Sequence, residues 1–461
     1  MLDAPTCLRS GFILSLSFLL IFTAYSATEV LETSIIPSHC SGCDEGPTTG
    51  TCQYGSMCQE KQQFACDVAC TAPFRECKSP LGGVVMGTMY LTFMTSAMAG
   101  PFLPHYFGEK KSMVGSSTMY AVFALANLVV ALNPTNVVLQ WGIMLPTAVL
   151  GGVAASFLWI SQASYLTRLS VLYSQFKRVP AIASVGLFNG IFLSFFKLAT
   201  LAGNTISALV LNALQWSTVS LFWIYTATSV AGTALLCLIP DLPLQAAAPL
   251  PTEYTKLLEP DSAVATMRSL AALAMDRRML ALTPIMLLNG LQQGFLSGEF
   301  TSNVVRESLG SAAIGTVFAV VGLVSVSSSF VFGKLADKFG PLPGQLVSFA
   351  ALLAAYIVCY VATVTKCDDQ WSLVLTVGVI LSIGDASSLA LVNVVLGQEF
   401  PHDTVNAFSL FRVYHAGATS FSFFYFPTLT FHGRLVLLLA AIVVSAVSYM
   451  LYYLRFRQAR H

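Results

Sequence analysis

The stretch Gly333-Lys-Leu-Ala-Asp-Lys-Phe-Gly340 is a charged segment between two long apolar runs. A glycine at each end allows two helices to approach closely and the chain to turn tightly. Asp337 and Lys338 can make charged contacts at helix ends, and a change in helix tilt would break such contacts. The stretch therefore predicts a tight turn between two membrane helices, in a protein that changes between two states.

The composition places these apolar runs in a membrane. Of 461 residues, 55% are hydrophobic and only 10% are charged, whereas soluble domains carry about a quarter charged residues. Runs of about 18 or more apolar residues, long enough to cross a bilayer, recur along the chain. We expect about twelve spans, near residues 11–34, 81–104, 112–132, 138–166, 181–211, 217–239, 279–300, 310–332, 343–365, 371–396, 404–430 and 433–454.

The positive charges predict how the chain is oriented. With the amino terminus in the cytosol, most basic residues fall on the cytoplasmic side: Arg9, Lys110, Lys111, Arg168, Lys177, Arg178, Lys256, Arg268, Arg277, Arg278, Lys334, Lys338, Arg455, Arg457 and Arg460. The outer side keeps Lys61, Arg75, Lys78, Arg306, Lys366 and Arg434. This bias predicts a multi-pass protein of the plasma membrane or an endomembrane, with both termini cytoplasmic. A cleaved signal peptide is the alternative for the first span, since Arg9 precedes an apolar core and small residues.

The spans fall into two halves. Residues 1–240 form an expected first bundle of six helices, and residues 279–461 a second bundle of six with a cytoplasmic tail. Residues 241–278 between them contain several prolines and end in Asp276-Arg-Arg278, which is typical of a solvated cytoplasmic linker. Two such halves indicate internal repeats around a cavity at the membrane midplane.

An outer loop over residues 37–80 is rich in cysteine. With one cysteine of a later outer loop, we expect four disulfides among Cys40, Cys43, Cys52, Cys58, Cys66, Cys70, Cys77 and Cys367. Eight cysteines allow about 105 pairings, so the connectivity stays open. Zinc is the alternative, suggested by Cys40-Ser-Gly-Cys43.

Charges inside apolar spans need a reason, because each costs about 2.5–3.5 kcal/mol at a helix centre. Asp385 and Arg412 both lie about 12–15 Å from the inner boundary, at 1.5 Å per residue. Equal depth on consecutive helices predicts a charge pair, which either gates the two-state change or pins two helices together. His415 shares a helix face with Arg412 and is either a titrating group or a packing residue.

Lys197 lies near the middle of the fifth expected span, with no carboxylate evident at its depth in the neighbouring spans. It either faces the cavity or extends along its helix toward the interface. Trp159 and Gln162 are candidates for the cavity lining, and ordinary helix packing is the alternative for Trp159.

Glu29 and Glu32 share one helix face near the outer end of the first span, and Glu299 lies near the outer end of the seventh. Because these spans are symmetry mates in a two-half transporter, the three side chains predict a ring of outer carboxylates that attracts cations or protons. Simple solvation at the outer interface is the alternative.

These features resemble a known family. The stretch Gly333 to Gly340 is similar to the signature loop of the major facilitator superfamily. Further blocks resemble its Unc-93-like branch: Phe22-Thr-Ala-Tyr25, Leu31-Glu-Thr-Ser34, Leu158-Trp-x-x-Gln162-x-x-Tyr165-Leu-Thr167, Gly290-Leu-Gln-Gln-Gly-Phe-Leu-Ser-x-Glu299-Phe-Thr301 and Gly384-Asp-Ala386. The resemblance implies an all-α, twelve-helix facilitator fold, to which this chain adds its cysteine-rich loop. Relatives include a regulator of potassium channels and an escort of membrane receptors.

Two functions follow as expectations. The first is a secondary transporter that moves a small solute or ion by alternating access. The second is an accessory protein that regulates an ion channel or escorts a membrane receptor. A net charge of +1 gives no indication of nucleic-acid binding. Motifs for ATP-driven pumping, nucleophilic catalysis or zinc proteases are absent from the sequence, so we expect no enzyme, no cofactor and no catalytic metal.

Overall fold

The computed structural model describes residues 3–35, 38–41, 49–52, 76–77, 80–98, 107–133, 136–178, 181–242, 263–310, 312–364, 370–400 and 403–457. Apart from one small sheet, these residues form helices. Among them, ten helices are long and apolar enough to cross a membrane. Two more, α2 and α15, lie beside these ten: α2 is apolar but shorter, and α15 runs over 22 residues.

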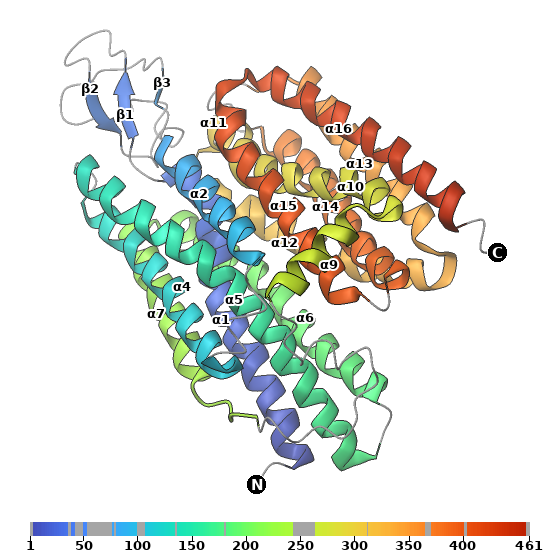
Figure 1. The fold of residues 1–461 in the computed structure, drawn as a ribbon. Coiled ribbons are helices and arrows are strands. Elements are labelled where there is room, and N and C mark those ends of the chain that lie inside the picture. Colours follow the sequence, from blue (N-terminus) through green and yellow to red (C-terminus); the bar gives the residue numbers. More distant parts are fainter. Residues whose placement is uncertain are drawn as a thin grey trace.

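The helices gather into two bundles (Figure 1). The first contains α1 (Ala4–Ile35), α2 (Pro80–Ala97), α4 (Glu109–Leu132), α5 (Val137–Lys177), α6 (Ala181–Ser207) with its continuation η1 (Ala208–Ala213), and α7 (Thr218–Leu236). Helix α1 packs against α6 and α7. Leu14, Phe18 and Ile21 are fully buried there, so residues that could belong to a signal peptide are part of the bundle core.

The second bundle begins with α10 (Arg277–Gly294), which continues through η2 (Phe295–Val305) and α11 (Arg306–Leu309). It then contains α12 (Ala313–Phe339), α13 (Pro341–Val361), α14 (Trp371–Glu399), α15 (Thr404–Tyr425), η3 (Phe426–Thr428), α16 (Phe431–Tyr452) and η4 (Tyr453–Arg457). Between the bundles, α9 (Ala263–Ala274) packs on α15. Part of the predicted cytoplasmic linker over residues 241–278 is therefore helical, while residues 243–262 lie outside the described part; its place in the cytosol stays a prediction.

The stretch from Gly333 to Gly340 is mostly helical. Helix α12 runs through Gly333 and ends at Phe339, and only Gly340 turns the chain, with a φ of 78°. Glycine adopts this left-handed conformation without the steric cost of a side chain, and Pro341 starts α13 at once. Lys334 and Lys338 are exposed on the last turns of α12. The side chain of Asp337 lies outside the described part.

The small sheet stands at one end of the bundles. Its strands are β1 (Ser38–Ser41), β2 (Thr49–Cys52) and β3 (Glu76–Cys77), in the antiparallel order β2-β1-β3. The register places the backbone of Cys40 opposite Cys77. Cys43, Cys58, Cys66, Cys70 and Cys367 lie outside the described residues, so the predicted disulfides and the zinc alternative stay untested.

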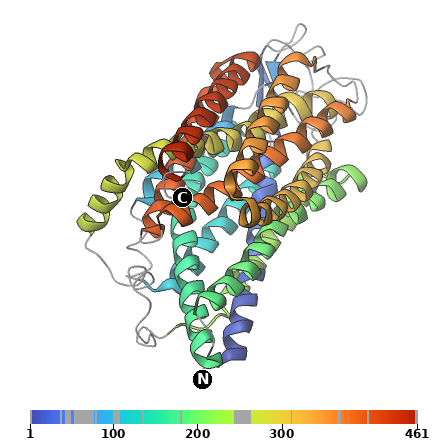
Figure 2. The same cartoon turned by 90° about the vertical axis from the view of Figure 1, so that its right-hand side faces the viewer.

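The end of the bundles nearest this sheet is called the sheet end. The other, where the chain starts and where the first bundle leads into residues 243–262, is called the linker end (Figure 2). The bundles meet along a seam where α2 lies against α15 and α6 against α12. A Cβ added to Gly315 of α12 would lie 2.5 Å from the backbone nitrogen of Ala208. Such a close approach is typical of membrane helices that associate through small residues.

Candidate functional site

Four chemically active side chains lie along the middle of the seam and come from both bundles. Lys197 is on α6 of the first bundle, Asp385 on α14, and Arg412 and His415 on α15. Each lies in the interior part of its helix, yet Arg412 is exposed and the other three are only partly buried. Because ionisable side chains inside membrane spans almost always face the bundle interior, a cavity or a partner, these residues form the candidate site.

Charges act across the seam within this group. The charge of Lys197 interacts electrostatically with those of Asp385 and Arg412. The acid and the base belong to different bundles. The absence of a carboxylate at the depth of Lys197 was expected only for its neighbouring spans, and Asp385 belongs to a helix of the other bundle.

The predicted pair of Asp385 and Arg412 is not present in this state. Within the described residues, Asp385 has no ion pair at 4.0 Å or less. The guanidinium carbon of Arg412 instead lies 5.3 Å from the ring centroid of Trp159, across the seam on α5. Equal depth on two helices stays a prediction, and depth alone does not say which way a side chain points around its helix.

Aromatic side chains line the first-bundle side of the site. Trp159 packs edge-to-face on Phe196, with ring centroids 4.9 Å apart. Phe22 lies 5.3 Å from Trp159 and 5.3 Å from Tyr120, and Tyr25 lies 5.2 Å from Tyr120. Trp159, Phe196 and Tyr25 are only partly buried, so part of this aromatic wall is open. Gln162, the other predicted lining residue, is 5% exposed on the same helix as Trp159.

Glu29 connects the bundles toward the sheet end. Its Oε1 accepts hydrogen bonds from Tyr90 Oη at 2.7 Å, from Gln293 Nε2 at 2.7 Å and from Ser297 Oγ at 3.4 Å. Tyr90 belongs to α2, whereas Gln293 and Ser297 belong to the second bundle. One turn further along α1, Thr33 Oγ1 donates to the carbonyl of Ser297 at 3.4 Å. This network joins the first and seventh long helices of the chain.

Glu32, one turn from Glu29, has a different environment. The residue is 1% exposed, and neither carboxylate oxygen has a hydrogen-bond partner among the described residues. Asn127 of α4 donates its amide to the carbonyl of Phe123 instead. An unpaired buried carboxylate is costly in its ionised form.

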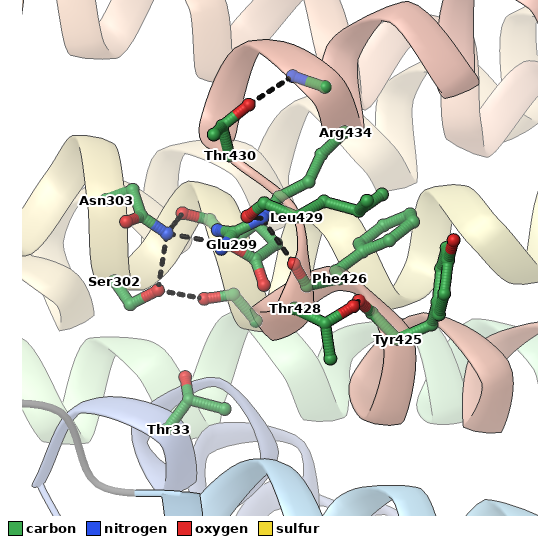
Figure 3. A network of polar contacts seen from close by, with 12 residues as sticks. Thr33, Glu299, Ser302, Asn303, Tyr425, Phe426, Thr428, Leu429, Thr430 and Arg434 are labelled. Atoms are coloured by element: carbon green, nitrogen blue, oxygen red, sulfur yellow. Dashed lines mark hydrogen bonds and ion pairs between the residues drawn. The ribbon is translucent and has the colours of Figure 1, made fainter.

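Glu299 belongs to a network inside the second bundle (Figure 3). It forms an ion pair with Arg434 of α16 and accepts a hydrogen bond from Asn303 Nδ2 at 2.7 Å. Arg434 Nε also donates to the carbonyls of Phe426 at 2.6 Å and Leu429 at 3.0 Å. Glu29, Glu32 and Glu299 are at most 7% exposed. The predictions of an outer carboxylate ring and of simple solvation are therefore both wrong: one glutamate bridges the bundles, one is unpaired and one staples two helices.

At the linker end, the charged contacts found among the described residues join side chains of the same bundle. Glu109, which starts α4 after the turn at Gly108, pairs with Arg168 of α5 at 3.1 Å. In the second bundle, Arg278 lies 3.1 Å from Asp276 and 3.7 Å from Glu399. Partial burial acts to raise the pKa of Asp276, but hydrogen bonds from Arg278 outweigh it and hold this pKa below the usual value of an aspartate.

Comparison with known proteins identifies the family. The family described as "Ion channel regulatory protein UNC-93" matches residues 79–450. The chain belongs to the UNC-93 family. Among its relatives, UNC93-like protein 3 of Arabidopsis thaliana is 26% identical over 439 residues, covering 94% of this chain and 83% of that protein. Human protein unc-93 homolog A is 23% identical over 478 residues, covering 96% and 92%.

Solved structures place this member of the UNC-93 family in the major facilitator fold. A partially occluded, inward-open xylose transporter XylE from E. coli superposes with a TM-score of 0.61 at 12% identity, covering 98% of both chains. A mutant of the nucleoside transporter NupG superposes with a TM-score of 0.59 at 13% identity, covering 96% of this chain and all of the other. At such identities the likeness concerns the fold alone. The Unc-93-like resemblance and the all-helical facilitator fold inferred from sequence are thus confirmed, while the twelve spans and the cysteine-rich outer loop stay predictions.

Sequence reasoning missed several partners. Tyr90 was not singled out, although a hydroxyl within an apolar span is a signal for a hydrogen-bond partner. Gln293 appeared only within a family block. Glu109 was not singled out from sequence, yet it is buried and ion-paired.

Proposed function

We propose that this UNC-93 family member is a secondary transporter with twelve spans, which moves a small solute or ion by alternating access. The supporting observation is the group Lys197, Asp385 and Arg412 at mid-seam, drawn from both bundles. Charges held at this depth without ion pairs are expensive, and a solute pathway is one reason to keep them. The two bundles then tilt about the seam and expose the group to each side in turn.

The contacts that cross the seam fit a state open toward the linker end. Glu29 to Gln293, Thr33 to Ser297, and Asn212 to Thr316 at 3.2 Å all lie toward the sheet end. Opening the sheet end would require these contacts to break. We place the linker end in the cytosol, as the basic residues predict.

Flux measurements with a cross-link test this mechanism. Purified protein in proteoliposomes is assayed with a panel of inorganic ions, organic anions, organic cations and neutral solutes. Asn212→Cys with Thr316→Cys, whose native side chains meet across the seam, should abolish flux once oxidised. Each single substitution under the same oxidation is the matched control, because it contains the same native cysteines. Full flux in the oxidised double variant would contradict alternating access.

An accessory role is the second candidate. It is favoured by the family description and by the "Putative potassium channel regulatory protein unc-93" of Caenorhabditis elegans, 23% identical over 394 residues that cover 78% of this chain and 48% of that protein. A channel or receptor would be the partner. Stable co-purification of such a protein, together with no flux of any solute, would support this role.

The cysteine-rich loop is proposed to lie outside the cytosol with four disulfides. Cys40 and Cys77 are proposed as one pair, because residues opposite each other on antiparallel strands bring their Cβ atoms within about 4.5–5.5 Å, close to disulfide spacing. Mass spectrometry of non-reduced peptides tests it. Free thiols at these two positions would contradict the pair.

A further inference from the structure

The inference concerns the solute that the site between the bundles takes, and it rests on the proposed transport function. Three solute classes are compared: cations, small inorganic ions and organic anions. The choice depends on which groups of the site lack a partner and on what surrounds them.

Arg412 is the side chain whose hydrogen-bonding capacity is unused. A guanidinium carries five N–H donors and no acceptor. Among the described residues Arg412 has neither a hydrogen bond nor an ion pair, and its polar group contacts only the rings of Trp159 and Phe411, at 5.3 Å and 5.8 Å. No carboxylate among the described residues lies within ion-pair distance of Arg412. Asp385 and Lys197 carry opposite charges. The carboxylate of Glu29 already accepts hydrogen bonds from three donors.

An anion is therefore the complement of this site. A planar guanidinium matches a carboxylate with two parallel hydrogen bonds. A cation would meet Arg412 and Lys197 with only Asp385 to compensate. His415, three residues from Arg412 on the same helix face, adds no acid to the site.

The aromatic wall indicates what the part of the solute other than its carboxylate is like. Trp159, over which Arg412 lies, and its neighbour Phe196 are both partly exposed. Phe22 packs against Trp159, and Tyr120 packs against Phe22. Ring faces at 4.9–5.3 Å centroid spacing form a surface on which a flat apolar group packs edge-to-face or offset. A small hydrated inorganic ion would gain nothing from this wall.

We propose that the site binds a small aromatic monocarboxylate, with its carboxylate on Arg412 and its ring against Trp159 and Phe196. Lys197 of the first bundle and Asp385 of the second can each receive a polar substituent of that ring. Both bundles would then hold the same solute, as alternating access requires.

Binding to the purified full-length protein in nanodiscs tests this assignment. The probes are phenylacetate, its uncharged analogue phenylacetamide, and acetate, followed by calorimetry and by thermal stabilisation. Phenylacetate should bind about tenfold or more tightly than either of the others, because each of them lacks one of the two contacts. Arg412→Gln should weaken phenylacetate binding by about 10- to 100-fold, which is the loss expected for hydrogen bonds to a charged group.

Matched variants separate the two contacts. Arg412→Lys keeps the charge but loses the planar fork, so it should restore only part of the affinity. Trp159→Ala should weaken phenylacetate and leave acetate unchanged, while Trp159→Phe should retain most binding. Arg455→Gln, which removes an exposed cation of η4 far along the chain, should change nothing.

The outcomes distinguish this inference from the proposed function. If phenylacetamide or phenyltrimethylammonium binds or crosses in preference to phenylacetate, the anion assignment is overturned and transport stands. Equal phenylacetate affinity in wild type and Arg412→Gln would overturn the placement of the carboxylate. If no solute of the flux panel moves and the 212–316 cross-link changes nothing, transport itself is overturned.

Discussion

The two ends of the seam are built differently. At the sheet end, hydrogen bonds pass from one bundle to the other, as between Glu29 and Gln293 at 2.7 Å and between Asn212 and Thr316 at 3.2 Å. At the linker end, the pairs Glu109–Arg168 and Arg278–Glu399 each stay within one bundle. Polar groups at the first end therefore hold the bundles together, whereas those at the second hold each bundle in its own shape.

This difference shows which contacts a two-state protein can change. A rigid-body tilt leaves contacts inside a bundle intact and breaks those that cross the seam. Disrupting a contact within a bundle should therefore lower stability without shifting the balance of states, and disrupting one across the seam should shift that balance.

The largest effect is expected from a contact inside one bundle. Glu299→Gln leaves Arg434 buried without its carboxylate, and breaking a buried ion pair costs about 3–5 kcal/mol. The thermal unfolding temperature should fall sharply. Thiol labelling of Ser420→Cys reports opening of the sheet end, because Ser420 is 3% exposed and meets the backbone of Gly87 across the seam; its rate should stay at the wild-type value. In the double variant Glu299→Leu, Arg434→Met, no unpaired charge remains, so much of the stability should return. Faster labelling in Glu299→Gln would show that this pair also controls the seam.

The next effect tests the closest approach across the seam. Gly315→Leu places side-chain atoms against the backbone of Ala208, which cannot move aside as a flexible side chain would. Overpacking costs about 1–3 kcal/mol, and this cost falls only on the state in which the sheet end is closed. Labelling of Ser420→Cys should accelerate. Gly142→Leu, where no atom lies within 4 Å of an added Cβ, is the control. Unchanged labelling in Gly315→Leu would mean that the sheet end does not open.

A smaller shift is expected at Glu29. Glu29→Leu removes the acceptor of Tyr90, Gln293 and Ser297 and leaves these donors unpaired, which costs about 1–3 kcal/mol in the closed sheet end. Glu29→Gln keeps a carbonyl oxygen for the same donors and should behave nearly as wild type. The ratio of labelling rates in the two variants measures the contribution of the acceptor. Equal labelling rates in the Leu and Gln variants would show that the acceptor at Glu29 does not stabilise the closed sheet end.

Much of this arrangement could be predicted from sequence. Hydropathy located the long helices, and the glycine at position 340 located a turn that the structure places at a φ of 78°. Depth along a helix follows from residue count, so Asp385, Arg412 and Lys197 were expected at mid-membrane.

What could not be predicted is which way each side chain points. Rotation about a helix axis depends on packing against neighbours from distant parts of the chain. Asp385 faces Lys197 from the other bundle, and Glu299 meets Arg434 of α16. Helix ends were also missed where polar residues continue a helix, as in α5, which extends to Lys177 rather than to residue 166.

The smallest effect is expected at Glu32, next to the bridging Glu29. Its two oxygens have no partner among the described residues, so the neutral carboxyl is the form that burial favours. Glu32→Gln replaces one neutral group by another of similar shape, and the unfolding temperature and the labelling rate of Ser420→Cys should both stay close to wild type. Glu32→Leu removes the buried polar group altogether and should raise stability slightly, by about 1 kcal/mol. A marked fall of the unfolding temperature in the Gln variant would show that Glu32 is ionised in the folded protein. Its charge would then contribute to the contacts at the seam next to Glu29.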